Sequence, residues 1–257
     1  MTLSTILLEQ RQVNVPVELL IDAQKKGYQK KLRLFLLLKL MFPSGKTRLS
    51  RNEMEFILMV EKIKSRKTFI SYFDFLLDKS WIYYNSRTGY FILKSLDRIR
   101  EENEWKGRWA IPVNFTSYRK LKAVIGAVIF GFLHKDFHRK LRRKKSVLVK
   151  GGTYNFQPGS LLRMSQTAPV SVYGAAILFN ISVSTASRLK QAAEKEKLLE
   201  VKKNFGDKTL NKEMAVKCLK YNDMNNEVVY HNGGYRLQLI DAILPLFLFV
   251  RRKKLKP

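Results

Sequence analysis

Acidic residues, cysteine and long apolar runs are all scarce in this sequence. The 257 residues include 21 Asp and Glu against 49 Lys and Arg, a formal net charge of +28 that is unusual for a metabolic enzyme. The single cysteine, Cys218, excludes an intramolecular disulfide, and the absence of a C-x-x-C pair excludes the common zinc-finger spacings. The longest charge-free apolar runs cover 11 and 9 residues, at 123–133 and 242–250, whereas a membrane-spanning helix needs about 20. We therefore expect a soluble protein of the reducing cytoplasm, without a signal peptide.

The sequence also shows no grouping of side chains that is typical of a catalytic or metal-binding site. Residues 114–165 hold one carboxylate, Asp136, so they lack the clustered acids of a metal-dependent nuclease. The pair His134 and His138 has the i, i+4 spacing of metal ligands, but basic residues surround it, and we interpret both as surface residues near phosphates. Since all three histidines lie in basic or loop contexts, a hydrolase triad is not indicated. We expect no enzymatic activity, no metal and no cofactor.

The positive charge that the sequence does have is spread along the chain. Residues 28–98 carry 15 basic and 6 acidic side chains, 114–165 carry 12 and 1, and 166–257 carry 16 and 8. With 46% apolar residues, 13 Gly and 7 Pro, the composition is that of a folded protein and not of a disordered basic tail. A folded polycation of this kind usually binds a polyanion, and nucleic acid is favoured over an acidic membrane surface. Charge alone does not say which nucleic acid, because phosphate attraction is independent of base sequence.

Residues 28–98 predict three helices followed by a hairpin. The three amphipathic helices are expected at 28–42, after Ser50 and after Ser65. Glu53 stands three residues after Ser50, which is the spacing of a capping box. Two aromatic and β-branched runs, at 81–84 and 90–93, flank a turn that contains glycine, and this pattern predicts a β-hairpin. Three helices followed by a hairpin resemble the element order of a winged helix.

Residues 114–257 repeat this order with larger insertions. A long first helix is predicted at 114–143, followed by a short strand at 146–149 and a loop through 165. The apolar segment 237–250 predicts a C-terminal helix or a dimer contact, with an interfacial membrane helix as the alternative.

The most specific stretch is 171–193, which resembles the helix-turn-helix motif of bacterial DNA-binding proteins. Ala176 is small enough for two helices to cross closely, and Asn180 stands where the chain must turn through a positive φ. Four apolar positions are expected to pack the two helices together, namely Phe179, Ile181, Ala186 and Leu189. A wing strand is expected after the second helix, with a turn at 204–207 and a return at 228–239.

The resemblance implies a set of DNA-contacting residues. On the second helix, 183–197, the outward side chains suit base reading and phosphate binding, and they are Ser184, Thr185, Ser187, Arg188 and Gln191. The wing residues expected at the DNA backbone are Lys202, Lys203 and Lys208. The equivalent face in the first half consists of Arg66, Lys67, Thr68 and Ser71. Arg87 at the hairpin tip suits a narrow minor groove, with an ordinary solvated turn arginine as the alternative.

These patterns predict a mainly α protein with small β-hairpins (α+β), built as two winged-helix domains in tandem. The expected division is an N-terminal arm at 1–27, domain 1 at 28–98, a linker at 99–113 and domain 2 at 114–257, with a long first helix and an extended wing. By its domain order the chain resembles plasmid-type replication initiators.

The predicted function is sequence-selective binding of double-stranded DNA, as a transcriptional regulator or as the replication initiator of a mobile element. We expect the protein in the cytoplasm at the nucleoid, with homodimerisation as a further interpretation and no membrane partner. Three alternatives stay open. In the first, one or both of the helical cores contact proteins, which includes dimerisation through the aromatic helix after Ser65. In the second, the chain is a nuclease or recombinase. In the third, it binds RNA by stacking bases on Tyr83, Tyr84, Tyr90 and Phe91.

Overall fold

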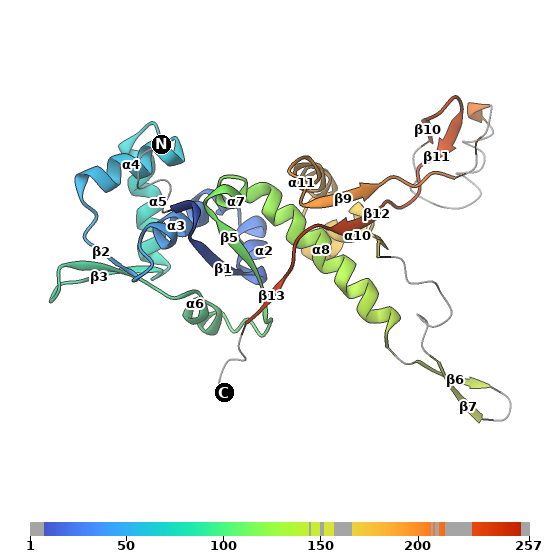
Figure 1. Cartoon of the computed structure of the whole chain (residues 1–257), viewed down its shortest axis with the longest axis horizontal. Helices are drawn as coiled ribbons and strands as arrows, with labels where there is room; N and C mark the ends of the chain where they lie inside the picture. Colours follow the sequence, from blue (N-terminus) through green and yellow to red (C-terminus); the bar gives the residue numbers. More distant parts are fainter. Residues whose placement is uncertain are drawn as a thin grey trace. The chain divides into compact units, whose positions relative to one another are not determined.

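The computed structural model describes residues 8–143, 145–149, 152–156, 166–206, 208, 211–213 and 228–252 (Figure 1). These residues form a mixed α+β structure in which helices alternate with small antiparallel sheets, as predicted at that level. The chain divides into two compact units. Unit 1 consists of Met1–Val128 and Phe247–Pro257, and unit 2 consists of Ile129–Leu246.

Unit 1 is built around α3 (Gln29–Met41), which is apolar on almost every side. It contacts α2 (Val17–Lys25), α4 (Arg51–Glu61), α5 (Arg66–Asp78) and α7 (Phe115–Arg119), so no face is left for solvent except a few basic positions. The fully buried side chains of this helix are Leu32, Leu34, Phe35, Leu36, Leu37, Leu38 and Leu40. Burial of this many apolar side chains makes α3 the core of the unit.

The predicted helix starts in unit 1 are confirmed. Ser50 accepts a hydrogen bond from the Glu53 backbone N–H, and the Ser50 backbone N–H donates to Glu53 Oε2 at 2.7 Å, which completes the capping box at α4. Ser65 accepts from the Thr68 N–H at 3.2 Å and begins α5. The end of α4 is set by Lys62 in the left-handed region, at φ 52°.

Unit 1 also contains a three-stranded sheet. Its strands are β2 (Lys46–Thr47), β3 (Ile82–Asn85) and β4 (Tyr90–Leu93), in the spatial order β2-β4-β3. The predicted hairpin is β3–β4, with Asn85 paired to Tyr90 and Gly89 at φ +68° in the turn. From α3 to β4 the elements follow the order helix, strand, helix, helix, strand, strand, and the first of these strands pairs with the third.

Segments predicted as an arm (1–27) and a linker (99–113) are structured where they are described. β1 (Gln12–Pro16) pairs with β5 (Trp109–Asn114), and β5 also pairs with β13 (Val250–Arg251). The helix α6 (Leu96–Glu102) takes the first part of the predicted linker. Pro112 is tolerated in the central strand because β13 pairs only with Trp109 and Ala110, so that among the described residues no strand pairs with the other side of Pro112.

Unit 2 repeats the element order of α3 to β4. The helix α8 (Leu121–Leu141) crosses the unit boundary, and β8 (Ala168–Pro169), α10 (Val172–Phe179), α11 (Val183–Lys195), β9 (Leu199–Lys202) and β12 (Ala242–Pro245) follow. The sheet has the order β8-β12-β9, so again the first strand pairs with the third. The single helix predicted at 114–143 is wrong, because Asn114 caps the short α7 and Lys120 leaves the helical conformation before α8 begins.

Two hairpins are inserted into this repeat. β6 (Lys145–Val149) pairs with β7 (Gly152–Phe156), so the expected loop begins one strand later than predicted, and its remainder at 157–165 lies outside the described residues. β10 (Val228–Tyr230) and β11 (Tyr235–Leu237) form the second hairpin, at the far end of the ribbon that β9 and β12 begin (Figure 1).

The turn predicted at 204–207 and the C-terminal helix predicted at 237–250 are both wrong. Phe205 bridges to Gln238 and the Gly206 N–H donates to the Leu237 carbonyl at 2.8 Å, so the ribbon continues through 204–206. Residues 242–245 and 250–251 are strands, since their backbones pair with segments far away in the sequence, which local periodicity does not show.

Candidate nucleic-acid interface

The two helices α10 and α11 are joined by a tight turn of the predicted kind. Asn180 has φ 48° and ψ 55°, the left-handed conformation that asparagine tolerates better than most residues. The Ile181 N–H donates to the Ala176 carbonyl at 3.0 Å, which closes the end of α10. Ser182 then caps α11 by accepting from the Thr185 N–H at 3.2 Å.

The inner faces of these helices pack as predicted. The buried side chains are Ala176, Phe179, Ala186 and Leu189, while Ile181 is half-buried. In unit 2 the ring of Phe179 also meets Phe132 of α8 edge to face, at a centroid distance of 6.0 Å. This packing leaves the opposite side of α11 to solvent.

The solvent side of α11 carries a polar stripe. Ser184, Arg188 and Gln191 are exposed, as predicted, and Lys195 continues the same stripe. At 100° per residue these four positions fall within about 60° of one another around the helix. Lys195 was missed by the sequence reasoning, although its i+4 spacing from Gln191 predicts its place. None of the four positions is acidic.

Two predicted residues are less available than expected. Ser187 is half-buried, and so is Thr185, whose hydroxyl accepts from Ser182 Oγ at 2.8 Å. Thr185 is therefore part of the helix cap. Its role in any interface is to hold the first turn of α11 in place while Ser184 and Arg188 face outward.

Arg188 lies back along its own helix. Its Nε donates to the Ser184 carbonyl at 3.3 Å and its Nη2 to Ser184 Oγ at 3.4 Å. Both contacts are long and solvent-exposed, so exchanging them for a ligand costs little. The guanidinium is a five-donor group that suits the two acceptors of guanine or a phosphate.

Lys190 on α11 faces inward and has a structural role. It forms an ion pair with Asp241, the residue before β12, and both side chains are nearly buried, with 12% and 5% exposed. The Asp241 carbonyl also accepts from the Val170 N–H at 3.0 Å. The pair fixes α11 against the base of the strand ribbon. Sequence reasoning placed Asp241 only in a predicted helix and gave Lys190 no role.

The ribbon presents lysines on an extended scaffold. Lys202 ends β9, and Lys203 and Lys208 follow; all three are exposed. The aliphatic part of Lys208 lies against Gly234, where a Cβ would meet it at 2.5 Å. In the β10–β11 turn, Asn232 and Gly233 have φ values of 49° and 75°, as a two-residue hairpin requires. The three predicted lysines thus lie along one ribbon and not at a single point.

The corresponding face of unit 1 differs in charge. Arg66, Lys67 and Ser71 are exposed on α5, and Thr68 is half-buried beside the Ser65 cap. Further along the helix, Asp74 and Asp78 are exposed as well. Since carboxylates repel phosphates, only the first turns of α5 suit a nucleic acid.

Arg87 is held out at the hairpin tip of unit 1. The Arg87 N–H donates to Asn85 Oδ1 at 3.0 Å, and the Gly89 N–H donates to the Asn85 carbonyl at 2.8 Å, so Asn85 organises the turn. The Arg87 side chain is exposed. This position agrees with both of the roles considered for it.

His134 and His138 lie on one side of α8, with ring centroids 4.5 Å apart and the ring planes tilted by 60°. His134 Nε2 lies 2.7 Å from the Gln166 carbonyl. Burial, and then the neighbouring His134, lower the pKa of His138 below its usual value. Among the described residues no group of three or more His, Cys, Asp or Glu side chains is placed to hold a metal.

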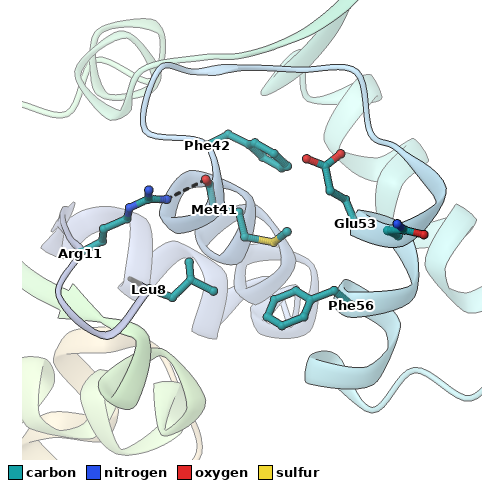
Figure 2. A pocket seen from close by; sticks show the side chains of 7 residues that line it. Leu8, Arg11, Met41, Phe42, Glu53 and Phe56 are labelled. Atoms are coloured by element: carbon teal, nitrogen blue, oxygen red, sulfur yellow. Dashed lines mark hydrogen bonds between the residues drawn. The ribbon is translucent and has the colours of Figure 1, made fainter. Parts of the chain in front are cut away.

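A pocket of about 420 Å³ opens in unit 1 between the start of the described chain, the end of α3 and α4 (Figure 2). Its two charged side chains already have structural partners. Arg11 Nη1 donates to the Leu40 and Met41 carbonyls at 3.1 and 2.9 Å, and Glu53 serves the capping box of α4. The rest of the lining is mostly apolar, from Leu8, Met41, Phe42 and Phe56. The arrangement contains no acid–base pair suited to catalysis.

No family model, curated protein or solved structure matches this chain. Within the part of the chain that the structure describes, no helix is both long and apolar enough to cross a membrane.

Proposed function

We propose that this protein binds double-stranded DNA sequence-selectively, with α11 as the recognition helix. The observation that carries the proposal is the acid-free polar stripe of Ser184, Arg188, Gln191 and Lys195, on a helix whose other face is anchored through a left-handed turn and a buried ion pair. A helix held in this way fits the major groove, where hydroxyl, amide and guanidinium groups distinguish base pairs.

The repeated topology supports the proposal. The elements α3 to β4 and, apart from the two inserted hairpins, the described elements α8 to β12 follow the order helix, strand, helix, helix, strand, strand, and in both the first strand pairs with the third. We interpret them as two winged-helix domains, with β3–β4 and the long β9–β12 ribbon as their wings. In this interpretation Lys202, Lys203 and Lys208 contact the phosphate backbone beside the site of α11.

The two units divide the work unequally in this proposal. The outward side of α5 changes from Arg66 and Lys67 to Asp74 and Asp78 along its length, whereas the solvent side of α11 carries one exposed acid, Glu194, beside the stripe. Unit 2 therefore supplies most of the base reading. Unit 1 adds contacts from the first turns of α5, including Thr68 and Ser71, and from Arg87. When both units engage one duplex, their sites are expected about 10 bp apart, on successive major-groove faces.

The biological role that fits is that of a transcriptional regulator or of a replication initiator from a mobile element. Both roles need a chain that finds one site among many, and neither needs a catalytic centre. Homodimerisation on a palindromic site is compatible with either role, and half-site symmetry in a selected sequence is the observation that indicates it.

A binding-site selection from random duplexes, followed by titration of the Arg188→Ala variant, tests the proposal. We expect the variant to lose about 1 to 3 kcal/mol of affinity for the selected site and little for random duplex. Arg98→Ala is the matched control, because Arg98 is equally an exposed helical arginine but lies on α6. Failure to select any sequence, or equal losses on selected and random DNA, contradicts sequence reading by Arg188.

A further inference from the structure

The sheet β2-β4-β3 of unit 1 has two chemically different faces. Ile82 and Leu93 lie opposite each other and are buried, and Phe91 meets Phe73 of α5 edge to face at 5.3 Å, so these side chains mark the helix-covered face. Successive residues of a strand point to opposite faces. Tyr83 and Tyr90 therefore lie on the other face, on either side of Ile92.

This second face combines aromatic rings with positive charge. Tyr83 is 49% exposed and has no ring partner among the described residues. Lys46 lies opposite Ile92 on β2 and is exposed, and the Arg48 guanidinium lies over the Tyr90 ring at 4.5 Å. The three strands contain no acidic residue. The face is thus an aromatic and basic surface.

We propose that this face binds single-stranded DNA, with unpaired bases stacked on Tyr83 and on the Arg48 guanidinium and a backbone phosphate held by Lys46. Aromatic rings beside cationic side chains are how proteins hold unpaired strands, since every base offers a planar face whatever its sequence. The choice of DNA over RNA rests on the proposed function in duplex DNA binding. The proposed stacking of a base on Tyr83 does not depend on that function.

The geometry assigns separate parts to the residues of this face. Across an antiparallel pair, diagonal neighbours such as Tyr83 and Tyr90 are roughly 7 to 8 Å apart. The Arg48 guanidinium already covers the Tyr90 ring, so Tyr83 is the tyrosine whose ring is open to a base. The planar guanidinium of Arg48 offers a second surface on which a base can stack. Two successive bases of an extended strand fit such a pair of planes, and Lys46 lies on the neighbouring strand to meet a phosphate.

Anisotropy titrations with three labelled 12-mers test the proposal: oligo(dT), an abasic strand with the same phosphates, and a duplex. We expect Tyr83→Ala to weaken oligo(dT) binding about tenfold and to change abasic and duplex binding less than twofold. Tyr84→Ala is the matched control, because Tyr84 is the adjacent, similarly exposed tyrosine and points to the opposite face. Lys46→Ala is expected to weaken the oligo(dT) and abasic strands alike.

Several results overturn the proposal. They are equal affinity for oligo(dT) and the abasic strand, equal losses from Tyr83→Ala and Tyr84→Ala, an equal loss on duplex, or tighter binding of oligo(U) than of oligo(dT). If Tyr83→Ala does not fold, Tyr83→Phe and Tyr83→Leu replace it, and equal affinity of these two for oligo(dT) refutes stacking. Arg188→Ala is expected to leave oligo(dT) binding unchanged, so failure of the duplex proposal is separable from failure of this one.

Discussion

The ion pair between Lys190 and Asp241 offers a sharp test of how α11 is held. Asp241→Asn keeps the shape of the side chain but removes the negative charge, and it leaves the Lys190 ammonium nearly buried without its partner. Breaking a buried pair by removing one charge typically costs about 3 to 5 kcal/mol. Because 12% of the Lys190 side chain still reaches solvent, we expect the lower end, about 3 kcal/mol.

The chain offers a convenient way to measure this loss. Its three tryptophans, Trp81, Trp105 and Trp109, all belong to unit 1, so tryptophan fluorescence follows unit 1 while far-UV circular dichroism also follows unit 2. With a urea m value of about 1.5 kcal/mol/M, a loss of about 3 kcal/mol lowers the unfolding midpoint of unit 2 by about 2 M. The fluorescence transition is expected to stay where it is in the wild type.

A double-mutant cycle separates the pair from its surroundings. Lys190→Met alone leaves the buried Asp241 carboxylate without its cationic partner, whereas Lys190→Met with Asp241→Leu replaces both charges by apolar groups. The double variant is expected within about 1 kcal/mol of the wild type, since apolar replacement of a buried pair is often neutral. A cost below about 1 kcal/mol for Asp241→Asn, or a double variant as unstable as the summed single variants, refutes a buried ion pair here.

Three further predictions concern the turn, the ribbon and a buried lysine. Asn180→Gly is expected to change the free energy of unfolding by less than about 1 kcal/mol, whereas Asn180→Ala costs about 1 to 2 kcal/mol because alanine resists positive φ; urea titrations followed by circular dichroism compare them. The double variant Lys202→Ala with Lys203→Ala is expected to weaken selected and random duplex alike and to reduce the slope of log affinity against log salt by about 2, and an unchanged slope contradicts phosphate contacts. Burial lowers the pKa of Lys39 to about 8, below its usual 10.5, so the unfolded chain binds more protons between pH 8 and 10.5. Unit 1 of the wild type should therefore gain stability relative to Lys39→Met as pH rises through that window, measured by tryptophan fluorescence in urea, and a constant difference contradicts the shifted pKa.

Sequence reasoning worked best where the signal is local. The helix caps at Ser50 and Ser65, the turn of the β3–β4 hairpin and the left-handed turn at Asn180 each depend on residues within about five positions of one another. Capping hydroxyls and turn residues act through their own backbone neighbours, so their meaning does not depend on the rest of the fold. The outward positions of α11 followed from the same local periodicity.

The same reasoning failed where distant segments pair. β1 and β5 are about a hundred residues apart in sequence, and local patterns predict an arm and a linker over most of these residues. Pro16 and Pro112 are tolerated in the strands because, among the described residues, one side of each strand has no partner at that position, which only the assembled sheet shows. Lys190 was missed for a related reason, since its partner Asp241 lies 51 positions away and nothing in the helix pattern indicates a pair.

The distribution of charge separates affinity from selectivity in the proposed interface. Most of the 49 basic residues lie outside the α11 stripe, and their attraction to phosphates is the same for every duplex sequence. The stripe itself contributes two uncharged polar residues, Ser184 and Gln191, one arginine able to form paired hydrogen bonds, and Lys195 at its end. Because hydrogen bonds to base edges depend on precise placement, the buried pair of Lys190 and Asp241 matters more for selectivity than for total affinity. Asp241→Asn, which loosens α11, should therefore reduce the ratio of the affinity for selected DNA to the affinity for random DNA. Removing ribbon lysines should lower both affinities and leave this ratio unchanged.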